Sequence, residues 1–263
     1  TFLEKLKAGT LVPYLGPGVL KYVRERTTNA LIPADSDSLI YGMTGGQAMS
    51  PRLMYEFPRA AMHLENKKGR KFIERYLTTT YAERQWQASE FHAWLASLHL
   101  PYVIDVNRDQ ILPTLYQDRE HLLVVGAARL AGTHYRFDIH HYVNGSYTRP
   151  AEDFSGAALP ILFKPYGCPV PTPSYVASDA DFVDYITELM GGFAIPAFMK
   201  QYRKQKQYLF TGVRFNRDTE RMVMSEIIFD ADTPAGWALL PDASDKEQRF
   251  CATKKVNVVS EDW

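Results

Sequence analysis

The chain has 263 residues, of which 46% are hydrophobic and 23% charged, so it can build one large α/β domain or a main domain with a smaller one. Thirty basic residues balance thirty acidic ones, so the overall charge attracts neither nucleic acid nor an anionic membrane. No apolar run approaches the roughly 18 residues of a membrane span. The two cysteines, Cys168 and Cys251, exclude a disulfide framework and a structural zinc ribbon, which makes a reducing cytoplasm the expected compartment.

The first distinctive feature is a glycine turn that follows a short apolar strand. Residues 11–15 predict the strand, Gly16-Pro17-Gly18 break it, and Val19 to Val23 resume at helical spacing. Backbone N–H groups at such a helix start, together with the helix dipole, form a site for a phosphate, and glycine lets a pyrophosphate approach the backbone. Because the third glycine of a dinucleotide motif is missing, a simple tight turn is the alternative interpretation.

The next segments predict a long connection followed by helices. Residues 24–50 show no periodicity and are rich in polar residues, proline and glycine, which predicts either a lid over a ligand or a surface insertion without regular structure. Residues 51–100 return to helical spacing in three groups, with Gly69 as a break. We interpret these groups as three helices of a cap, whose aromatic residues form core rather than a cofactor site.

A second buried strand, residues 102–106, ends in Asn107-Arg108-Asp109, and residues 110–116 resume a helical pattern. Polar side chains at the carboxyl end of a parallel strand point into the crevice where open α/β sheets bind ligands. Asn107 and Asp109 are therefore candidate site residues. Asp109 is also a candidate cap for the following helix, and the two roles are compatible.

A strand at 122–127 precedes the segments 135–140 and 142–147, which alternate around Asn144-Gly145 and predict a β-hairpin. This region carries three histidines, His134, His140 and His141. A metal site that includes Asp138 is one interpretation, but neighbouring strand residues point to opposite faces, so partly exposed hairpin histidines without a metal are preferred.

The alternation of strands and helices continues to the end of the sequence. A strand at 159–163 leads into Lys164-Pro165-Tyr166-Gly167-Cys168, where Cys168 lacks an assignable base and is interpreted as a buried structural thiol. The later elements are a capped helix after Ser178 that ends at 191–192, a helix at 195–207, a strand at 208–211, a helix at 219–228, a strand at 236–241, a helix at 244–252 that opens with a capping box, and a strand at 256–259. This alternation predicts a doubly wound, mostly parallel sheet.

The order of these blocks resembles the divergent bacterial branch of the sirtuin-like NAD-binding family. That branch shows a G-A-G-V-S-like turn, T-T-N-Y-D, K-L-H-G, L-F-x-G-y-S-x-x-D and a late Y-A-V-L-P-like strand. The corresponding blocks here are Gly16-Pro17-Gly18-Val19, the strand end Asn107-x-Asp109, Lys164-Pro165-Tyr166-Gly167, Leu209-Phe210-Thr211-Gly212 with Asp218, and Trp237-Ala238-Leu239-Leu240-Pro241.

The resemblance implies a Rossmann-type nucleotide-binding domain, residues 1–23 and 101–263, with an inserted loop and helical cap at 24–100 and a β-hairpin insertion at 129–150. It also implies an NAD or ADP-ribose-type nucleotide in the cleft, whereas the lack of zinc-binding cysteines in this sequence argues against zinc. By this resemblance Asn107 positions an attacking water or acyl oxygen, Asp109 faces the nicotinamide and its ribose, and Tyr166 stands at the catalytic position. The implied nucleotide-binding residues are Gly16, Pro17, Gly18, Val19, Gly167, Thr211, Gly212 and Val213.

The departures from the family pattern concern catalysis. Tyr166 replaces the family's histidine base, and a phenol with an ordinary pKa near 10 is protonated at neutral pH. Leu20 replaces a serine after the glycine turn, and Val106 stands where deacylases carry a glutamine. Together with the absence of zinc-binding cysteines, these departures argue against a typical protein deacylase.

Three functions are compatible with the sequence. The first is hydrolysis of NAD or a related nucleotide, which the retained Asn107-x-Asp109 favours. The second is a degenerate module that holds a nucleotide without turnover and acts through a protein partner or a homo-oligomer, which Tyr166 favours. The third is an α/β domain that binds no nucleotide.

Overall fold

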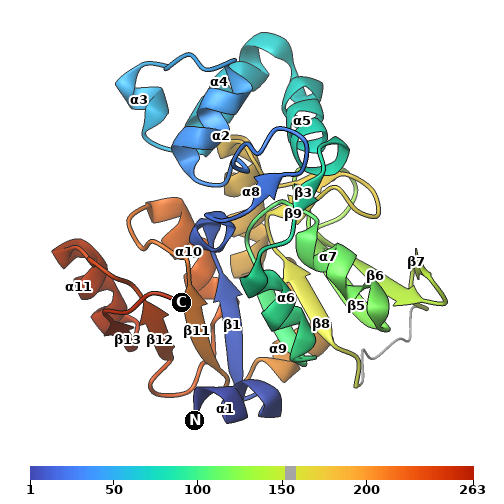
Figure 1. Ribbon diagram of the computed structural model, residues 1–263, viewed down its shortest axis with the longest axis vertical. Coiled ribbons are helices and arrows are strands. Elements are labelled where there is room, and N and C mark those ends of the chain that lie inside the picture. Colours follow the sequence, from blue (N-terminus) through green and yellow to red (C-terminus); the bar gives the residue numbers. More distant parts are fainter. Residues whose placement is uncertain (152–157) are drawn as a thin grey trace.

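The computed structural model describes residues 1–151 and 158–263, and its centre is a nine-stranded, mostly parallel sheet (Figure 1). The strands of this sheet are β1 (Leu11–Leu15), β4 (Tyr102–Asp105), β5 (His121–Gly126), β6 (Phe137–Val143), β7 (Ser146–Thr148), β8 (Ile161–Lys164), β11 (Gln207–Thr211), β12 (Gly236–Leu239) and β13 (Val256–Val259). Their order across the sheet is β13-β12-β11-β1-β4-β8-β5-β6-β7, and every pair from β13 to β5 is parallel. Strands β6 and β7 continue the sheet in antiparallel pairing. The predicted α/β fold with a Rossmann-type sheet is confirmed.

Helices and short elements surround this sheet. The α-helices are α1 (Phe2–Ala8), α2 (Ser36–Met43), α3 (Pro51–Met54), α4 (Phe57–Lys68), α5 (Arg70–Thr78), α6 (Glu90–Ser97), α7 (Ile111–Leu115), α8 (Asp179–Gly191), α9 (Ala197–Tyr202), α10 (Asp218–Ile227) and α11 (Asp245–Thr253). The short helical turns are η1 (Pro17–Leu20), η2 (Thr79–Glu83) and η3 (Tyr116–Asp118). Two small ladders complete the fold: β2 (Arg24–Glu25) with β3 (Trp86–Gln87), and β9 (Gly167–Cys168) with β10 (Ser174–Tyr175).

Strand β1 shows why the sheet is buried on both faces. Leu11 and Leu15 pack into one apolar core, which also holds buried residues of α6 and α7. Val12 and Tyr14 alternate with them and pack into a second core, which is covered by α8, α9, α10 and α11. A strand with helices over both faces is apolar at every position, which is the pattern that residues 11–15 display.

Beyond the carboxyl ends of the central strands lies a group of helices, α2, α3, α4 and α5, which we call the cap (Figure 1). Two expectations require correction here. Residues 24–50 contain α2, because the Asp35 side chain accepts a hydrogen bond from Ser38 N and Leu39, Ile40 and Met43 are buried. Helix α6 is not part of the cap, since it packs against α7 beside the sheet.

Two predicted helices are shorter than expected. After the glycine turn the chain forms only the 3₁₀ turn η1, and its backbone then leads into β2. Helix α9 ends at Tyr202, and the left-handed backbone of Gln205, with φ of 58°, prevents its continuation. The predicted cap of α8 is present as a capping box, and so is the predicted capping box of α11. The turn between β6 and β7 has positive φ at both Asn144 and Gly145, which is the geometry that this dipeptide favours.

Within the described ranges, no helix has the length and apolar character needed to cross a membrane.

Candidate functional site

The candidate site is a cavity of about 70 Å³ at the carboxyl ends of the central strands. The chain builds β4, β8 and β5 on one side of β1 and later returns to add β11 on the other side, so the strand order reverses at β1. Ligands of open α/β sheets bind in the crevice outside such a reversal. Segments that follow β1, β4, β8 and β11 line the cavity, and α2, the start of α4 and η2 cover it.

Asn107 lies in this cavity directly after β4, in a fixed orientation. Its amide nitrogen donates to Gly16 O at 2.9 Å and to Asp105 Oδ1 at 3.0 Å. Both partners are acceptors only, so the nitrogen must face them and the amide oxygen is the group that meets the cavity. The structure therefore places the tip of β4 beside the glycine turn that follows β1.

A buried ion pair holds the residue that orients Asn107. Lys164 Nζ lies 2.8 Å from Asp105 Oδ2, and neither side chain is more than 1% exposed. Burial alone would lower the pKa of Lys164, but the charges of Asp105 and Asp109 raise it above its ordinary value. The other oxygen of Asp105 accepts from both the backbone and the side chain of Asn107. The end of β4 is thus fixed by a charged network that does not contact solvent.

Asp109 lies outside the lining of the cavity. Its side chain is fully buried, and Oδ1 accepts a hydrogen bond of 2.9 Å from Ile111 N at the start of α7. Oδ2 has no hydrogen-bond partner among the described residues. The N-cap of α7 is Gln110, so Asp109 stands one residue before the predicted capping position and still accepts a hydrogen bond from the first residue of the helix.

Arg108, which the sequence did not single out, is a buried cation in the wall of the cavity. Its side chain is 8% exposed, and Nε and Nη2 donate to Val176 O at 3.1 and 2.7 Å. The guanidinium lies over the rings of Phe57 and Tyr166. No carboxylate among the described residues forms an ion pair with it, and burial lowers its pKa. The carboxylates of Asp181 and Glu220 act on it only through space, so the buried guanidinium is suited to a direct contact with an anionic ligand.

Tyr166, predicted at the position of the family's base, also lines the cavity and is 6% exposed. Its ring makes an edge contact with Phe182 in addition to the contact with Arg108. Burial, foremost, and the carboxylate of Glu220 raise the pKa of Tyr166 well above its ordinary value. The phenol consequently stays protonated at neutral pH and can donate a hydrogen bond, but it does not accept a proton.

Two carboxyl groups that the sequence did not predict face the same cavity. Glu220 comes from the first turn of α10, and Glu56 precedes α4 in the cap. Burial and the neighbouring carboxylate of Glu56 raise the pKa of Glu220 to about 7. Burial likewise raises the pKa of Glu56. Because the two residues are more than 160 positions apart, only the folded chain reveals the pair.

The glycine turn differs from a phosphate-binding turn in its hydrogen bonds. Gly16 N donates to Thr211 O, Gly18 N donates to Gly212 O, and Val19 N donates to Gly16 O, while Pro17 has no N–H group. The expectation of free donors at this turn is therefore wrong. Glycine is required for another reason, because a Cβ on Gly18 would lie 2.7 Å from Gly212 Cα.

The other predicted nucleotide-binding residues are distributed over several places. Pro17 lines the 70 Å³ cavity, and Val19 is buried in the core. Gly16 and Val213 line a smaller hollow of about 20 Å³ between the ends of β1 and β11. Gly167 lies in β9. Its φ is positive, and a Cβ at this position would collide with Ser174 O, so the position requires glycine.

Thr211 lines a second, larger cavity of about 830 Å³, whose walls carry the aromatic rings of Tyr22, Phe91, Trp94 and Trp263. The glycine turn lies close to both this cavity and the 70 Å³ cavity. Pro17 lines the smaller cavity, whereas the position of a Cβ on Gly18 is 2.9 Å from the Trp263 ring that lines the larger one. The ammonium group of Lys21 lies over the Trp263 ring, with Nζ 4.0 Å from the ring centre.

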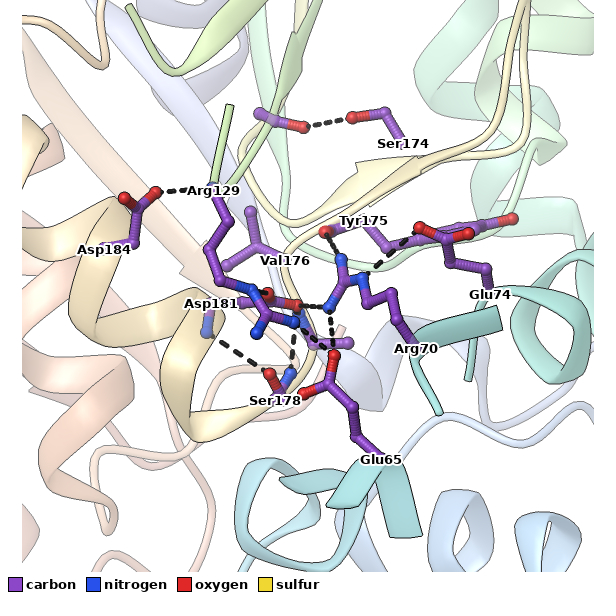
Figure 2. A network of polar contacts seen from close by, with 12 residues as sticks. Glu65, Arg70, Glu74, Arg129, Ser174, Tyr175, Val176, Ser178, Asp181 and Asp184 are labelled. Carbon is purple, nitrogen blue, oxygen red and sulfur yellow. Dashed lines mark hydrogen bonds and ion pairs between the residues drawn. The ribbon is translucent and has the colours of Figure 1, made fainter. Parts of the chain in front are cut away.

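A network of ion pairs fastens the cap to the sheet domain, and we call it the latch (Figure 2). It joins Glu65 of α4 and Arg70 of α5 to Arg129, which follows β5, and to Asp181 of α8. Arg70 and Arg129 both donate to the carboxylate of Asp181, which is fully buried. Asp181 also accepts from the backbone of Ala177 and Ser178, so the acidic centre of the latch is fixed to the start of α8.

The remaining chemically active side chains lie apart from the cavity. His134 contacts Glu188 and His141 contacts Glu120. No group of metal-binding side chains occurs in the described part of the chain. Cys168 is buried, its Sγ donates to Val170 O, and burial raises its pKa to about 11. This thiol is therefore a poor nucleophile.

The sequence matches no protein-family model and no curated relative.

Proposed function

We propose that this protein binds NAD or a related ADP-ribose nucleotide at the carboxyl ends of β1 and β4, under the cap. The observation that carries the proposal is the buried guanidinium of Arg108, which lines a cavity at the reversal of strand order and forms no direct ion pair with a carboxylate of the described chain. An anionic ligand at this place supplies a direct ion-pair partner.

The cavity walls offer complementary contacts to a nucleoside. The oxygen of Asn107 accepts a hydrogen bond from a ribose hydroxyl or a water, and the phenol of Tyr166 donates one. The aromatic rings of the larger cavity, beyond the glycine turn, provide stacking surfaces for a base. Because the glycine turn has no free donors, the positive charge for the phosphates comes from arginine side chains, of which Arg217 also faces the smaller cavity.

Ligand-induced thermal stabilisation tests the proposal directly. NAD and ADP-ribose should raise the melting temperature, because a ligand that binds only the folded state stabilises it by RT ln(1 + [L]/Kd). Arg108→Gln, which keeps a donor for Val176 O but removes the charge, should abolish this shift. Arg52→Gln changes an exposed arginine of the cap and serves as the matched control. A wild-type protein whose melting temperature does not respond to any nucleotide would refute the proposed function.

A further inference from the structure

We propose that Glu220 is the proton acceptor in the hydrolysis of the bound nucleotide, a reaction in which Asn107 orients the attacking water as the family resemblance implies. This inference rests on the proposed nucleotide binding and adds a base to it. The base would be a carboxylate of α10, a helix on which the sequence predicted no catalytic group.

The first argument is the arrangement of groups in the cavity. Asn107 is 5% exposed, its nitrogen is fully used by Gly16 O and Asp105, and its oxygen receives no hydrogen bond from the described residues. Glu220 lines the same cavity from the first turn of α10, which follows β11. An unsatisfied acceptor and a carboxylate that share a small cavity can both accept hydrogen bonds from one water molecule, which holds it for attack.

The second argument is the surroundings of Glu220. Four charged groups alter how readily it holds a proton: Glu56 before α4, Arg108 after β4, and Arg217 and Arg221 at the start of α10. Tyr166 after β8 lines the same cavity, and the charge of Glu220 raises the pKa of that phenol. Burial is the largest influence and Glu56 the second, and both raise the pKa of Glu220, to about 7. A base with a pKa near the working pH is present in its ionised form and still binds the proton strongly enough to assist. Tyr166 does not meet this condition.

The proposed step is balanced in atoms and electrons. The water oxygen forms a bond to the anomeric carbon of the ribose, and the bond from that carbon to the nicotinamide nitrogen breaks. The bonding pair stays on the nitrogen, so a cationic nicotinamide group leaves as neutral nicotinamide. The carboxylate of Glu220 takes the proton from the water, and the other product is ADP-ribose.

The test measures nicotinamide release from NAD as a function of pH, with nucleotide-induced thermal stabilisation measured in parallel. The wild-type rate should rise with pH and level off above about 7, because only ionised Glu220 accepts the proton. Glu220→Gln should lower the rate at least 100-fold, the minimum typical of a lost general base, while the thermal shift remains. Glu226→Gln, on the same helix but outside the cavity lining, should retain the wild-type rate.

A second variant separates a catalytic role from a structural one. Glu56→Gln removes the neighbouring carboxylate that raises the pKa of Glu220 in the free enzyme, so the midpoint of the pH profile of kcat/KM, which reports free-enzyme groups, should move to lower pH. An unchanged midpoint, or an unchanged rate in Glu220→Gln, would overturn the inference. Nucleotide binding without any nicotinamide release from the wild type would also overturn it but leave the proposed function standing, whereas a lack of binding would remove both.

Discussion

At the scale of single residues, the pair between Lys164 and Asp105 should be the interaction most sensitive to substitution. Lys164→Met leaves the carboxylate of Asp105 without a counter-ion in a fully buried place, which typically lowers the free energy of unfolding by about 3–5 kcal/mol. Chemical denaturation measures this loss, with the exposed Lys7→Met as control. The double variant Asp105→Asn/Lys164→Met should recover part of the stability, because it removes both charges. A single variant as stable as the control would contradict this account.

The burial of His92 leads to a prediction of how the free energy of unfolding depends on pH. The side chain is 1% exposed, and burial, acting against the charges of Asp109 and Asp105, lowers its pKa below the ordinary value of about 6.5. The unfolded chain then binds a proton at a higher pH than the folded chain does. The contribution of His92 to stability is therefore complete above pH 6.5 and is lost as the pH falls from there toward the folded-state pKa.

Denaturation at pH 7.5 and at pH 5.5 measures this loss. His92→Gln should reduce the difference in unfolding free energy between the two conditions without abolishing it, since burial also lowers the pKa of His121. An identical difference in the variant and in the wild type would show that His92 does not cause the effect.

At the scale of elements, the latch between the cap and the sheet domain should control how often the cap opens. Arg70→Gln removes one of the two arginines that donate to the buried Asp181 and also the contact with Tyr175 O. Hydrogen bonds to charged groups typically contribute about 1.5–3 kcal/mol, so backbone amides of α4 and α5 should exchange faster with solvent deuterium. Amides of β1 and β4 should be unaffected. Arg75→Gln, an exposed arginine on the same helix, is the control, and equal exchange in both variants would argue against the latch.

At the scale of the whole molecule, the sequence predicts the sheet well and the site only in part. Periodicity identifies the strands because each buried strand is apolar throughout, as β1 shows. Because the predicted strands run parallel, their carboxyl ends meet at one edge of the sheet, which places Asn107 and the glycine turn at neighbouring strand ends. The sequence does not reveal Arg108 or Glu220, because their importance comes from burial and from partners far along the chain. The sequence does not indicate helix α2, because its N-cap residue, Asp35, stands between Pro33 and Gly42, which favour a loop.

The size of the candidate cavity leads to a prediction about the movement of the cap. Pockets for small molecules and cofactors usually enclose about 300–1,000 Å³, whereas the cavity that holds Arg108 and Glu220 encloses about 70 Å³. A dinucleotide that reaches both residues must therefore displace the cap from the sheet domain. Binding should be accompanied by a change in the distance between the two parts.

Spin labels on Lys67→Cys in α4 and Lys246→Cys in α11 report this distance, because both positions are exposed. The native thiols do not interfere, since Cys168 and Cys251 are buried and burial raises the pKa of each, to about 11 and about 12. Saturating NAD should shift the distance distribution, whereas labels at Lys7→Cys and Lys246→Cys, both outside the cap, should report no change. If NAD raises the melting temperature but leaves the first distribution unchanged, the nucleotide binds outside the closed cavity, and the contact with Arg108 is excluded.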